Sequence, residues 1–223
     1  MPTLLQNAAQ FKVLTPPHIL RLQLRLIEQA GRTCYQSEAG VISIESSHRF
    51  ISMLLKRGHL SVLEHAIMVV QFSLCSRGMT HEQVRHRLTG ISQESTRYVD
   101  ESDLRAVVPP FYNTGSEEYE EFEEAFTDAE THYRNLRNMG VPPEDARQVL
   151  PIGTVSQIVV SANYREWRHI FKMRCAKQAH WEIRSVMTKL LETIKLGCSP
   201  VFDDFEYGGK HRGIPYYTWK YEA

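Results

Sequence analysis

The sequence is compatible with an α+β fold, because strand-like and helix-like periodicities follow one another along a single chain. Residues 66–74 carry alternating apolar side chains, many of them β-branched, which predicts a half-buried strand. Residues 116–139 repeat apolar side chains at intervals of three and four, which predicts an amphipathic helix. The chain has 223 residues, 42% of them apolar, which suffices for the core of one large domain or two small ones.

Composition excludes several classes of protein. Lys+Arg and Asp+Glu both number 26, and this neutral balance argues against a dedicated nucleic-acid binder, which usually carries a basic excess. The four cysteines are widely separated and form no C-x-x-C pair, so we expect reduced thiols in a cytosolic protein. We also expect no signal peptide and no membrane span, because no apolar run has the required pattern or length. The expected location is therefore cytoplasmic.

The first third of the chain is expected to form one strand and two helices. Residues 11–14 predict a short strand. An apolar stripe at helical spacing after Pro17 predicts a helix that stops at Gly31, although alternating leucines in the same segment also fit a strand. A second helix is expected over residues 47–57, with Gly58 at its end.

In the middle of the chain, two helix starts are indicated. Thr80 and the glutamine three residues later have the form of a capping box, so a helix is expected to lead into residues 85–87 and to end at Gly90. The helix over residues 116–139 begins with a run of glutamates, which complements the positive end of the helix dipole, and Gly140 follows it. The acidic run is therefore interpreted as a solvated helix face and not as a metal site.

The last third is expected to alternate again between strand and helix. Residues 142–151 predict a short helix bracketed by prolines, and residues 154–161 predict a strand. Asn163, with a glutamate three residues later, has the pattern of a helix N-cap. A helical stretch then runs to Gly197, with a break near residues 177–179.

The densest group of polar side chains lies between Arg85 and Tyr98. It holds three arginines, a histidine, serines, an amide and a carboxylate within fourteen residues. Arginine presents a rigid fork of donors that suits phosphate and carboxylate, so this stretch is a candidate anion socket. The alternative is a solvated basic helix end followed by a turn.

The same stretch resembles a known family. The order Arg-His-Arg, seven further residues, Ser95 and then Arg97-Tyr98 resembles the signature of the flavin-dependent thymidylate synthases. Other segments that follow the family's order are residues 58–65, 144–151 and 163–184. The resemblance therefore extends roughly from residue 58 to residue 184.

The resemblance implies an α+β fold in which helices flank an antiparallel sheet. It implies a single domain over residues 1–223, with a glycine- and aromatic-rich tail from about residue 201, and a homotetramer with sites shared between subunits. The implied reaction is reductive methylation of dUMP to dTMP. Methylenetetrahydrofolate supplies the carbon and leaves as tetrahydrofolate, FAD mediates the reaction, and NADPH supplies the hydride. In such a division the cofactor carries the chemistry, while the protein binds and orients.

The resemblance also assigns site residues by their match to the family. Arg174 matches the arginine beside the uracil ring and is the expected catalytic residue, because a fixed cation stabilises negative charge developing on the base. The residues expected to contact FAD are Ser61, Arg85, His86, Arg87, Gln93, Asn163, Arg165 and His169. The residues expected to contact dUMP are Glu82, Arg85, Gln93, Glu94, Ser95, Arg97, Arg147 and Arg174.

Two departures from the family pattern add negative charge near the expected phosphate. Glu82 stands where the family often has glutamine, and Glu94 stands where members often have an apolar residue. No G-x-G-x-x-G or Walker loop is present, so a dinucleotide would bind outside the Rossmann style. The histidines lack the i, i+4 spacing of a helical zinc site, so no metal is predicted.

Two other functions remain open from the sequence. One is a flavin reductase that oxidises NADPH without methyl transfer. The other is a nucleic-acid-binding module that uses Arg85, Arg87 and Arg97. The neutral net charge argues against the second, and steep salt dependence of binding would support it.

Overall fold

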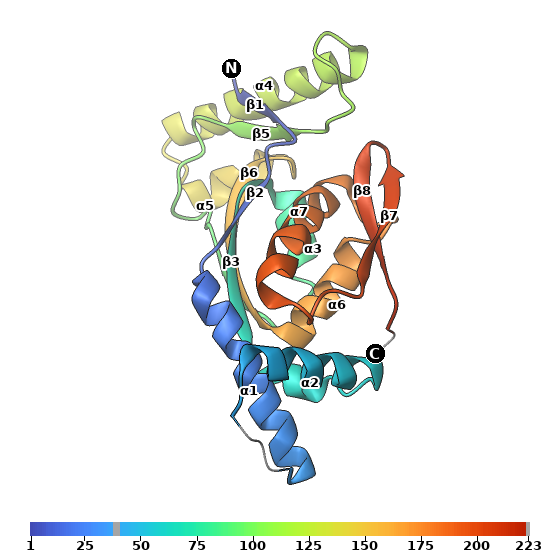
Figure 1. Ribbon diagram of the computed structural model, residues 1–223. Coiled ribbons are helices and arrows are strands. Elements are labelled where there is room, and N and C mark those ends of the chain that lie inside the picture. The colour runs from blue at the N-terminus through green and yellow to red at the C-terminus, as the bar shows by residue number, and fades with distance from the viewer. Residues whose placement is uncertain (38–40, 222–223) are drawn as a thin grey trace. The chain divides into compact units, whose positions relative to one another are not determined.

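The computed structural model describes residues 1–37 and 41–221, and it confirms the expected mixture of helices and strands (Figure 1). The α-helices are α1 (Pro17–Tyr35), α2 (Ile44–Lys56), α3 (Arg77–Gln83), α4 (Glu117–Asn138), α5 (Pro143–Ala146), α6 (Tyr164–Arg174) and α7 (Trp181–Cys198). Two 3₁₀ segments are η1 (Ser61–His65) and η2 (Arg147–Val149). The strands are β1 (Thr3–Gln6), β2 (Gln10–Val13), β3 (Ile67–Ser76), β4 (Gly90–Gln93), β5 (Arg105–Val108), β6 (Val155–Asn163), β7 (Phe205–His211) and β8 (Ile214–Trp219).

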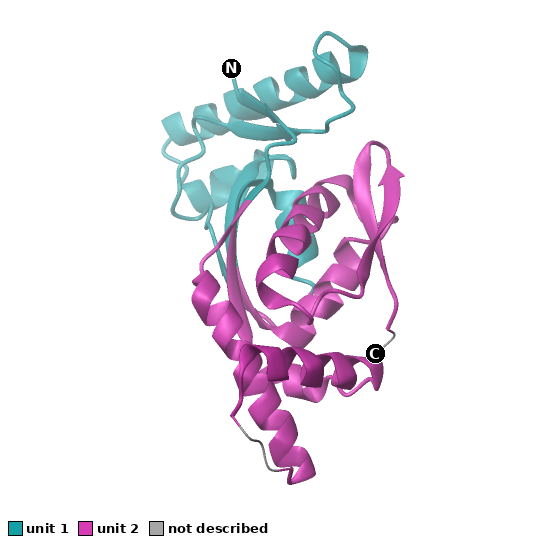
Figure 2. Cartoon of the chain, in the orientation of Figure 1, with its two compact units in different colours: residues 1–10, 72–85, 91–159 teal, residues 11–71, 86–90, 160–223 magenta. Residues whose placement is uncertain are grey.

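The chain divides into two compact units (Figure 2). Unit 1 consists of residues 1–10, 72–85 and 91–159, and unit 2 consists of residues 11–71, 86–90 and 160–223. Strands β3 and β6 each contribute residues to both units. The expectation of one domain over the whole chain stays a prediction.

Three sheets are formed among the described residues. The largest has four strands in the order β2-β3-β6-β4, and the antiparallel hairpin β7–β8 accounts for the tail that the sequence left unassigned. The third sheet is a separate pair, in which β1 lies parallel to β5 with Thr3 opposite Arg105.

Strand β3 confirms the strand predicted from alternation and extends it. Met68, Val70 and Phe72 are fully buried, as one apolar face requires. At Leu74 the backbone turns to φ 51, and the burial pattern then shifts so that Cys75 and Ser76 are buried next to each other. The positive φ at Leu74 thus interrupts the alternation of buried and exposed side chains, which the sequence pattern of this strand did not predict.

Helix α1 does not stop at Gly31 as predicted. It continues to Tyr35, and Gln36 ends it in the left-handed conformation with its N–H bonded to the carbonyls of Arg32 and Thr33. Gly31 is a packing position instead, because a Cβ there would lie 2.4 Å from Cε1 of Phe50 in α2. The glycine permits a close approach of the two helices.

Helix α2 begins three residues earlier than the predicted start at residue 47. The reason is a reciprocal cap. Ser43 Oγ accepts the N–H of Ser46 at 3.1 Å, and Ser46 Oγ accepts the N–H of Ser43 at 2.9 Å. The buried carboxylate of Glu28 in α1 also accepts from Ser46 Oγ at 2.7 Å. The cap therefore joins α2 to α1 within unit 2.

The break predicted in the long C-terminal helical stretch is confirmed. Helix α6 ends at Arg174, and α7 begins at Trp181. Arg184 in the first turns of α7 donates from Nη1 to the carbonyls of Lys177 and Ala179, at 2.5 and 2.8 Å. These bonds satisfy backbone groups that the interrupted helix leaves open. Helix α7 continues through Gly197, the predicted end, to Cys198.

In unit 1, the cap of α3 differs from the prediction. Ser76 accepts the N–H of Met79 at 3.0 Å and is the N-cap, while Thr80 lies inside the helix and donates to the carbonyl of Arg77. The helix ends at Gln83, before the Arg-His-Arg segment. Residues 90–93, where the end of the helix was expected, form strand β4 instead.

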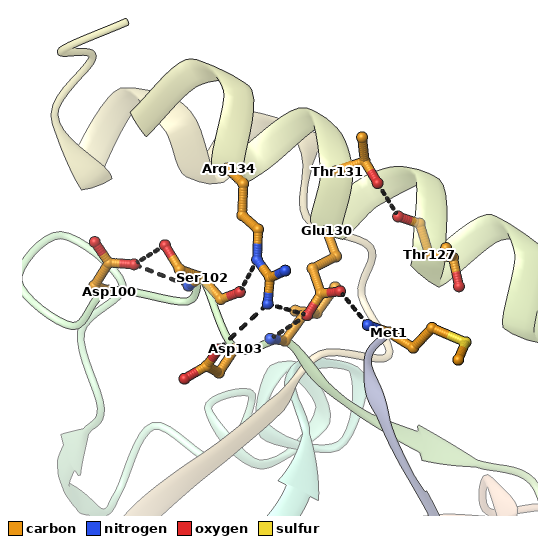
Figure 3. Close-up of polar contacts among 9 residues, drawn as sticks. Met1, Asp100, Ser102, Asp103, Thr127, Glu130, Thr131 and Arg134 are labelled. Atoms are coloured by element: carbon orange, nitrogen blue, oxygen red, sulfur yellow. Dashed lines mark hydrogen bonds and ion pairs between the residues drawn. The ribbon is translucent and has the colours of Figure 1, made fainter. Parts of the chain in front are cut away.

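Helix α4 confirms the most regular helical pattern of the sequence, including its N-cap Ser116. It is joined to the segment before β5 by Glu130 and Arg134 (Figure 3). Glu130 accepts the N–H of Leu104 at 3.2 Å, and Arg134 donates to Glu130 at 3.2 Å and to the carbonyl of Ser102 at 2.6 Å. These contacts hold α4 against the chain around β5, where Phe126 and Ala129 of the helix pack with Leu104 and Ala106.

No helix among the described residues has the length and apolar character needed to cross a lipid bilayer.

Candidate functional site

A cavity of unit 2 lies along α6. It is open to solvent and has a volume of about 820 Å³, which is in the usual range for cofactor and substrate sites. The cap residue Asn163 and the helical residues Arg165, Glu166 and His169 contribute side chains to it. Its other lining residues are Leu60, Glu64, Leu88, Arg168 and Lys172.

Asn163 lies at the cavity because it is the N-cap of α6. Its Oδ1 accepts the N–H of Glu166 at 2.8 Å, which confirms the cap predicted from the sequence. The same bond fixes the direction of the side chain, since the oxygen is held by the helix. The amide NH₂ of Asn163 is then the group available to a ligand in the cavity.

Two cations of the cavity, Arg165 and Lys172, are already held in place. Arg165 donates to Glu64 at 2.5 Å, and both side chains are about half exposed. Lys172 donates to the carbonyl of Tyr221 at 3.1 Å and lies 5.7 Å from the ring centre of Trp219. These contacts reduce the number of rotamers that each cation can adopt, so less freedom is lost when an anion binds.

A smaller cavity of about 380 Å³ adjoins the first and shares Leu60 and Arg165 with it. Ser61, predicted to contact FAD, lines this cavity together with Tyr35 and His59. The Tyr35 hydroxyl and Nδ1 of His59 are 2.5 Å apart, and the two rings are stacked. Ser61 therefore lies next to the α6 cavity but not inside its lining.

His86, the central residue of the Arg-His-Arg segment, is buried, with 5% of its surface exposed. Its Nε2 is 3.0 Å from Nε of Arg174, and its ring meets that of His169 edge-on at 5.7 Å between centroids. Burial, and then the charges of Arg174 and His169, lower the pKa of His86 to about 4. The imidazole is therefore neutral at physiological pH.

The two arginines beside His86 differ from it in exposure. Arg85 and Arg87 are both exposed, and within residues 1–37 and 41–221 neither guanidinium has a hydrogen-bond or ion-pair partner. Exposed arginines without internal partners are available to a ligand. The Arg-His-Arg segment thus places one buried, hydrogen-bonded ring between two solvent-exposed cations.

His86, Glu166 and His169 form a group that the sequence reasoning missed. Their potential ligand atoms all lie within 4.8 Å of one another, which is the spacing of a candidate metal site. Glu166 and His169 are an i, i+3 pair on α6, and Glu-x-x-His on a helix was the available signal. The partner from the Arg-His-Arg segment was not identifiable, because it lies 80 positions away in the sequence.

The hydrogen-bond pattern of this group does not suit a cation. Arginine is always a donor, so Nε2 of His86 must accept from Arg174. In the neutral ring the proton is then on Nδ1, which faces Glu166 Oε1 at 3.8 Å. A metal at Nδ1 would require the loss of that proton, so the geometry favours a proton between His86 and Glu166. The expectation of no metal stays a prediction.

In unit 1, two arginines predicted to contact dUMP meet at Glu144. Arg97 approaches Glu144 Oε2 with Nε and Nη2, both at 2.9 Å. Arg147 donates from Nε to the backbone carbonyl of Glu144 at 3.0 Å and from Nη1 to Thr96 Oγ1 at 3.3 Å. The two guanidinium groups are thereby held around one residue, as an anion socket requires.

The remaining residues of the Ser-containing segment also have internal partners. Gln93 donates to Thr80 Oγ1 at 2.8 Å, and Ser95 Oγ accepts the N–H of Arg97 at 3.3 Å. Glu94 accepts from Gln157 at 2.8 Å, so its carboxylate is held by β6. This contact explains how the extra negative charge of Glu94 is accommodated within unit 1.

The structure sorts the predicted residues between the units. Unit 2 contains most of the residues expected to contact FAD, namely Ser61, His86, Arg87, Asn163, Arg165 and His169, and it also contains Arg174. Unit 1 contains the others, namely Glu82, Arg85, Gln93, Glu94, Ser95, Arg97 and Arg147. Residues that line or support the sites and were not predicted are Tyr35, Glu64, Glu144, Glu166 and Lys172.

Arginine, lysine and histidine side chains line the open cavity together with two glutamates, and such cations are the groups that proteins use to bind anionic ligands. The particular family follows from sequence comparison, because the family model described as "Thymidylate synthase complementing protein" matches residues 21–198, and the chain belongs to this family. A flavin-dependent thymidylate synthase from Geobacter sulfurreducens is 36% identical over 183 residues, which are 78% of this chain and 78% of that protein. One from Mycobacterium marinum is 37% identical over 197 residues, covering 81% and 79%.

A solved structure confirms the fold class. The crystal structure of a UMP/dUMP methylase, PolB from Streptomyces cacaoi bound with 5-Br dUMP, matches with a TM-score of 0.74. The match covers 90% of this chain and 97% of that chain at 18% sequence identity. The expected α+β fold and the resemblance stated from the Arg-His-Arg motif are thus both confirmed.

Proposed function

We propose that this protein is a flavin-dependent thymidylate synthase that converts dUMP to dTMP. The observation that carries the proposal is the family match over residues 21–198, which contains the whole Arg-His-Arg segment. The balanced reaction consumes dUMP, methylenetetrahydrofolate, NADPH and a proton, and releases dTMP, tetrahydrofolate and NADP⁺. The folate, NADPH, a cytoplasmic location and a homotetramer with shared sites belong to this proposal.

The residues of the α6 cavity fit FAD. The amide of Asn163 and the half-exposed Arg165 supply donors for an anionic pyrophosphate. Arg87 is not part of the lining, but it is exposed, has no internal partner among the described residues and directly precedes the lining residue Leu88. The cavity volume of about 820 Å³ also suits a large cofactor. When bound, the flavin supplies the redox chemistry of the reaction. The chain's own residues bind it, orient it and exclude water.

The residues predicted to contact dUMP carry donors that suit a phosphate or a uracil ring. Arg97 and Arg147 are guanidinium donors for the phosphate, and the hydroxyl of Ser95 is a further donor. Arg174, oriented by its bond to His86, stabilises the negative charge that develops on the uracil ring.

The experiment begins with the absorbance spectrum of the purified protein, which is expected to show a flavin that NADPH bleaches under nitrogen. Added dUMP and methylenetetrahydrofolate are then expected to yield dTMP, measured by chromatography. Arg174→Ala should keep the flavin and lose dTMP formation. A bleached flavin without dTMP from the unaltered protein would show a flavin reductase instead.

A second arm tests the FAD residues. Arg87→Ala and His169→Ala are each expected to lower the flavin bound per chain, and Arg21→Ala, an exposed arginine of α1, is the matched control. Full flavin occupancy in both site variants would contradict the assignment. Colourless protein whose binding to DNA weakens steeply with salt would support the nucleic-acid-binding alternative.

A further inference from the structure

Three side chains of unit 2 form a line in which each polar group faces the next. Arg174 Nε is 3.0 Å from His86 Nε2, and His86 Nδ1 is 3.8 Å from Glu166 Oε1. Glu166 lies in the first turn of α6, and Arg174 is the last residue of the same helix. His86 therefore lies between two residues of one rigid element.

The Glu166 carboxylate is an unusual group to bury. It is 7% exposed, and within residues 1–37 and 41–221 no N–H or O–H group lies within hydrogen-bond distance of it. Burial raises its pKa, and the neighbouring His169 partly opposes that effect. The residue also lines the open α6 cavity, so its carboxylate lies between that cavity and the His86 ring.

The order of donors along the line explains what Glu166 can do. The guanidinium of Arg174 can only donate, so His86 must present an unprotonated Nε2 to it. A carboxylate opposite the other nitrogen stabilises the tautomer that carries its proton on Nδ1. At 3.8 Å this contact is longer than a hydrogen bond, so its effect is electrostatic.

We propose that Glu166 is a positioning residue, which fixes the tautomer and ring orientation of His86 and thereby the direction of the Arg174 guanidinium. This inference rests on the proposed function, in which Arg174 faces the uracil ring. Glu166 also lines the α6 cavity, so the flavin content of its variants separates its effect on His86 from an effect on cofactor binding. It acts through His86, as carboxylates next to active-site histidines do when they fix the tautomer and orientation of the ring.

The first test is independent of activity. Imidazole-¹⁵N-labelled histidine is incorporated into the full chain, and the His86 signals are assigned by their loss in His86→Gln. At neutral pH the unaltered protein is expected to show a protonated Nδ1 and an unprotonated Nε2. The opposite tautomer in the unaltered protein overturns the proposal, whether or not the protein makes dTMP.

The second test compares variants. Glu166→Leu removes the carboxylate and is expected to shift His86 toward the Nε2-protonated tautomer. That tautomer cannot accept from Arg174, so the bond between them is lost and kcat should fall by about ten- to a hundredfold. The KM for dUMP and the flavin content should stay within about twofold. Glu166→Gln keeps the size of the side chain but removes its charge, so it should change the tautomer and kcat as Glu166→Leu does, whereas Glu166→Asp keeps the carboxylate and should retain most of both.

Glu45→Gln is the matched control, because Glu45 also lies in the first turn of a helix and interacts with the helix dipole, but at an exposed position of α2. It should leave kcat and the His86 signals unchanged. A Glu166→Leu protein with an unaltered His86 tautomer, or one that loses flavin while kcat per bound flavin is unchanged, would contradict the positioning role. If Glu166→Leu does not fold, Glu166→Ser is measured by the same criteria.

Discussion

Arg97 directs two nitrogens, Nε and Nη2, at the same oxygen of Glu144, and both distances are 2.9 Å. Both side chains are about half exposed. An ion pair of this kind contributes at most about 1 kcal/mol, because solvent screens it. The pair can therefore hold Arg97 in place and still release it to a phosphate.

The Arg97–Glu144 pair gives the first prediction. In Glu144→Gln the phosphate of dUMP no longer competes with a carboxylate, so the KM for dUMP should fall by up to about fivefold. Steady-state kinetics at varied dUMP measures the effect. Glu120→Gln, on the solvated face of α4, is the control. A higher KM in Glu144→Gln would show that Glu144 itself binds the nucleotide.

The second prediction concerns Ser95, which could be mistaken for a nucleophile. Its Oγ accepts the N–H of Arg97, and the proposed route through a flavin needs no serine adduct. Loss of one bond to a charged group costs about 1.5–3 kcal/mol, so Ser95→Ala should raise the KM for dUMP roughly ten- to a hundredfold and still form dTMP.

A nucleophilic Ser95 would give a very different result. Removal of a nucleophile typically costs on the order of a million-fold in rate. Absence of dTMP from Ser95→Ala at saturating dUMP, with flavin bound, would therefore overturn the binding role. Ser92→Ala, in the neighbouring strand β4, is the matched serine control.

The third prediction separates helix capping from ligand binding at Asn163. Aspartate caps a helix as well as asparagine does, so Asn163→Asp should keep the thermal stability. It replaces the amide donors by a second carboxylate oxygen facing the cavity, so flavin retention should fall. Asn163→Ala should lose both flavin and about 1 kcal/mol of stability.

Thermal unfolding and the flavin absorbance per chain measure the two effects of Asn163 separately. If Asn163→Asp retains the flavin as well as the unaltered protein does, the amide donates no bond to the cofactor. If Asn163→Asp is destabilised as much as Asn163→Ala, the N-cap hydrogen bond is not the means by which Asn163 stabilises the fold.

The fourth prediction is a pH dependence of stability. The pKa of His86 is about 4 in the folded chain and 6.5 in the reference state, so the unfolded chain binds more protons between these values. Stability from this group is complete above pH 6.5 and is lost as the pH falls toward 4. Between pH 7 and pH 5 the loss is about 2 kcal/mol, from about 1.5 pKa units at 1.36 kcal/mol each.

Urea unfolding at pH 7 and pH 5 tests this prediction, with His86→Gln as the comparison. The variant lacks the titrating ring, so its stability should fall less than that of the unaltered protein. Glu166 acts in the opposite direction, because burial raises its pKa and protonation relieves the cost. Equal losses in the two proteins would show that His86 does not carry the dependence.

The sequence predicted a helix or strand correctly where the structure of that segment depends mainly on residues that are neighbours in the sequence. The cap at Asn163, the regular stripe of α4 and the alternation of β3 each depend on neighbours in the sequence. The capping box at Thr80 failed because Ser76, four residues earlier, captures the helix start. Two local signals competed there, and the sequence alone does not rank them.

The site was predictable as a set of residues but not as an arrangement. The Arg-His-Arg motif identified His86, and the helix cap identified Asn163. Glu166 was treated only as part of a cap, because its relation to His86 depends on a contact across 80 positions. Likewise, nothing local to Arg97 indicates that it meets Glu144.

Gly31 has a consequence for the geometry of the smaller cavity. The last turn of α1 extends beyond this glycine and carries Tyr35 to His59. A Cβ at position 31 would lie 2.4 Å from Cε1 of Phe50, so a larger residue there requires the Phe50 ring or the helix to shift. A shift of the helix at this point would move the turn that carries Tyr35, which lines the smaller cavity. A residue that resembles a stop signal thus lies one turn before a side chain of the cavity wall.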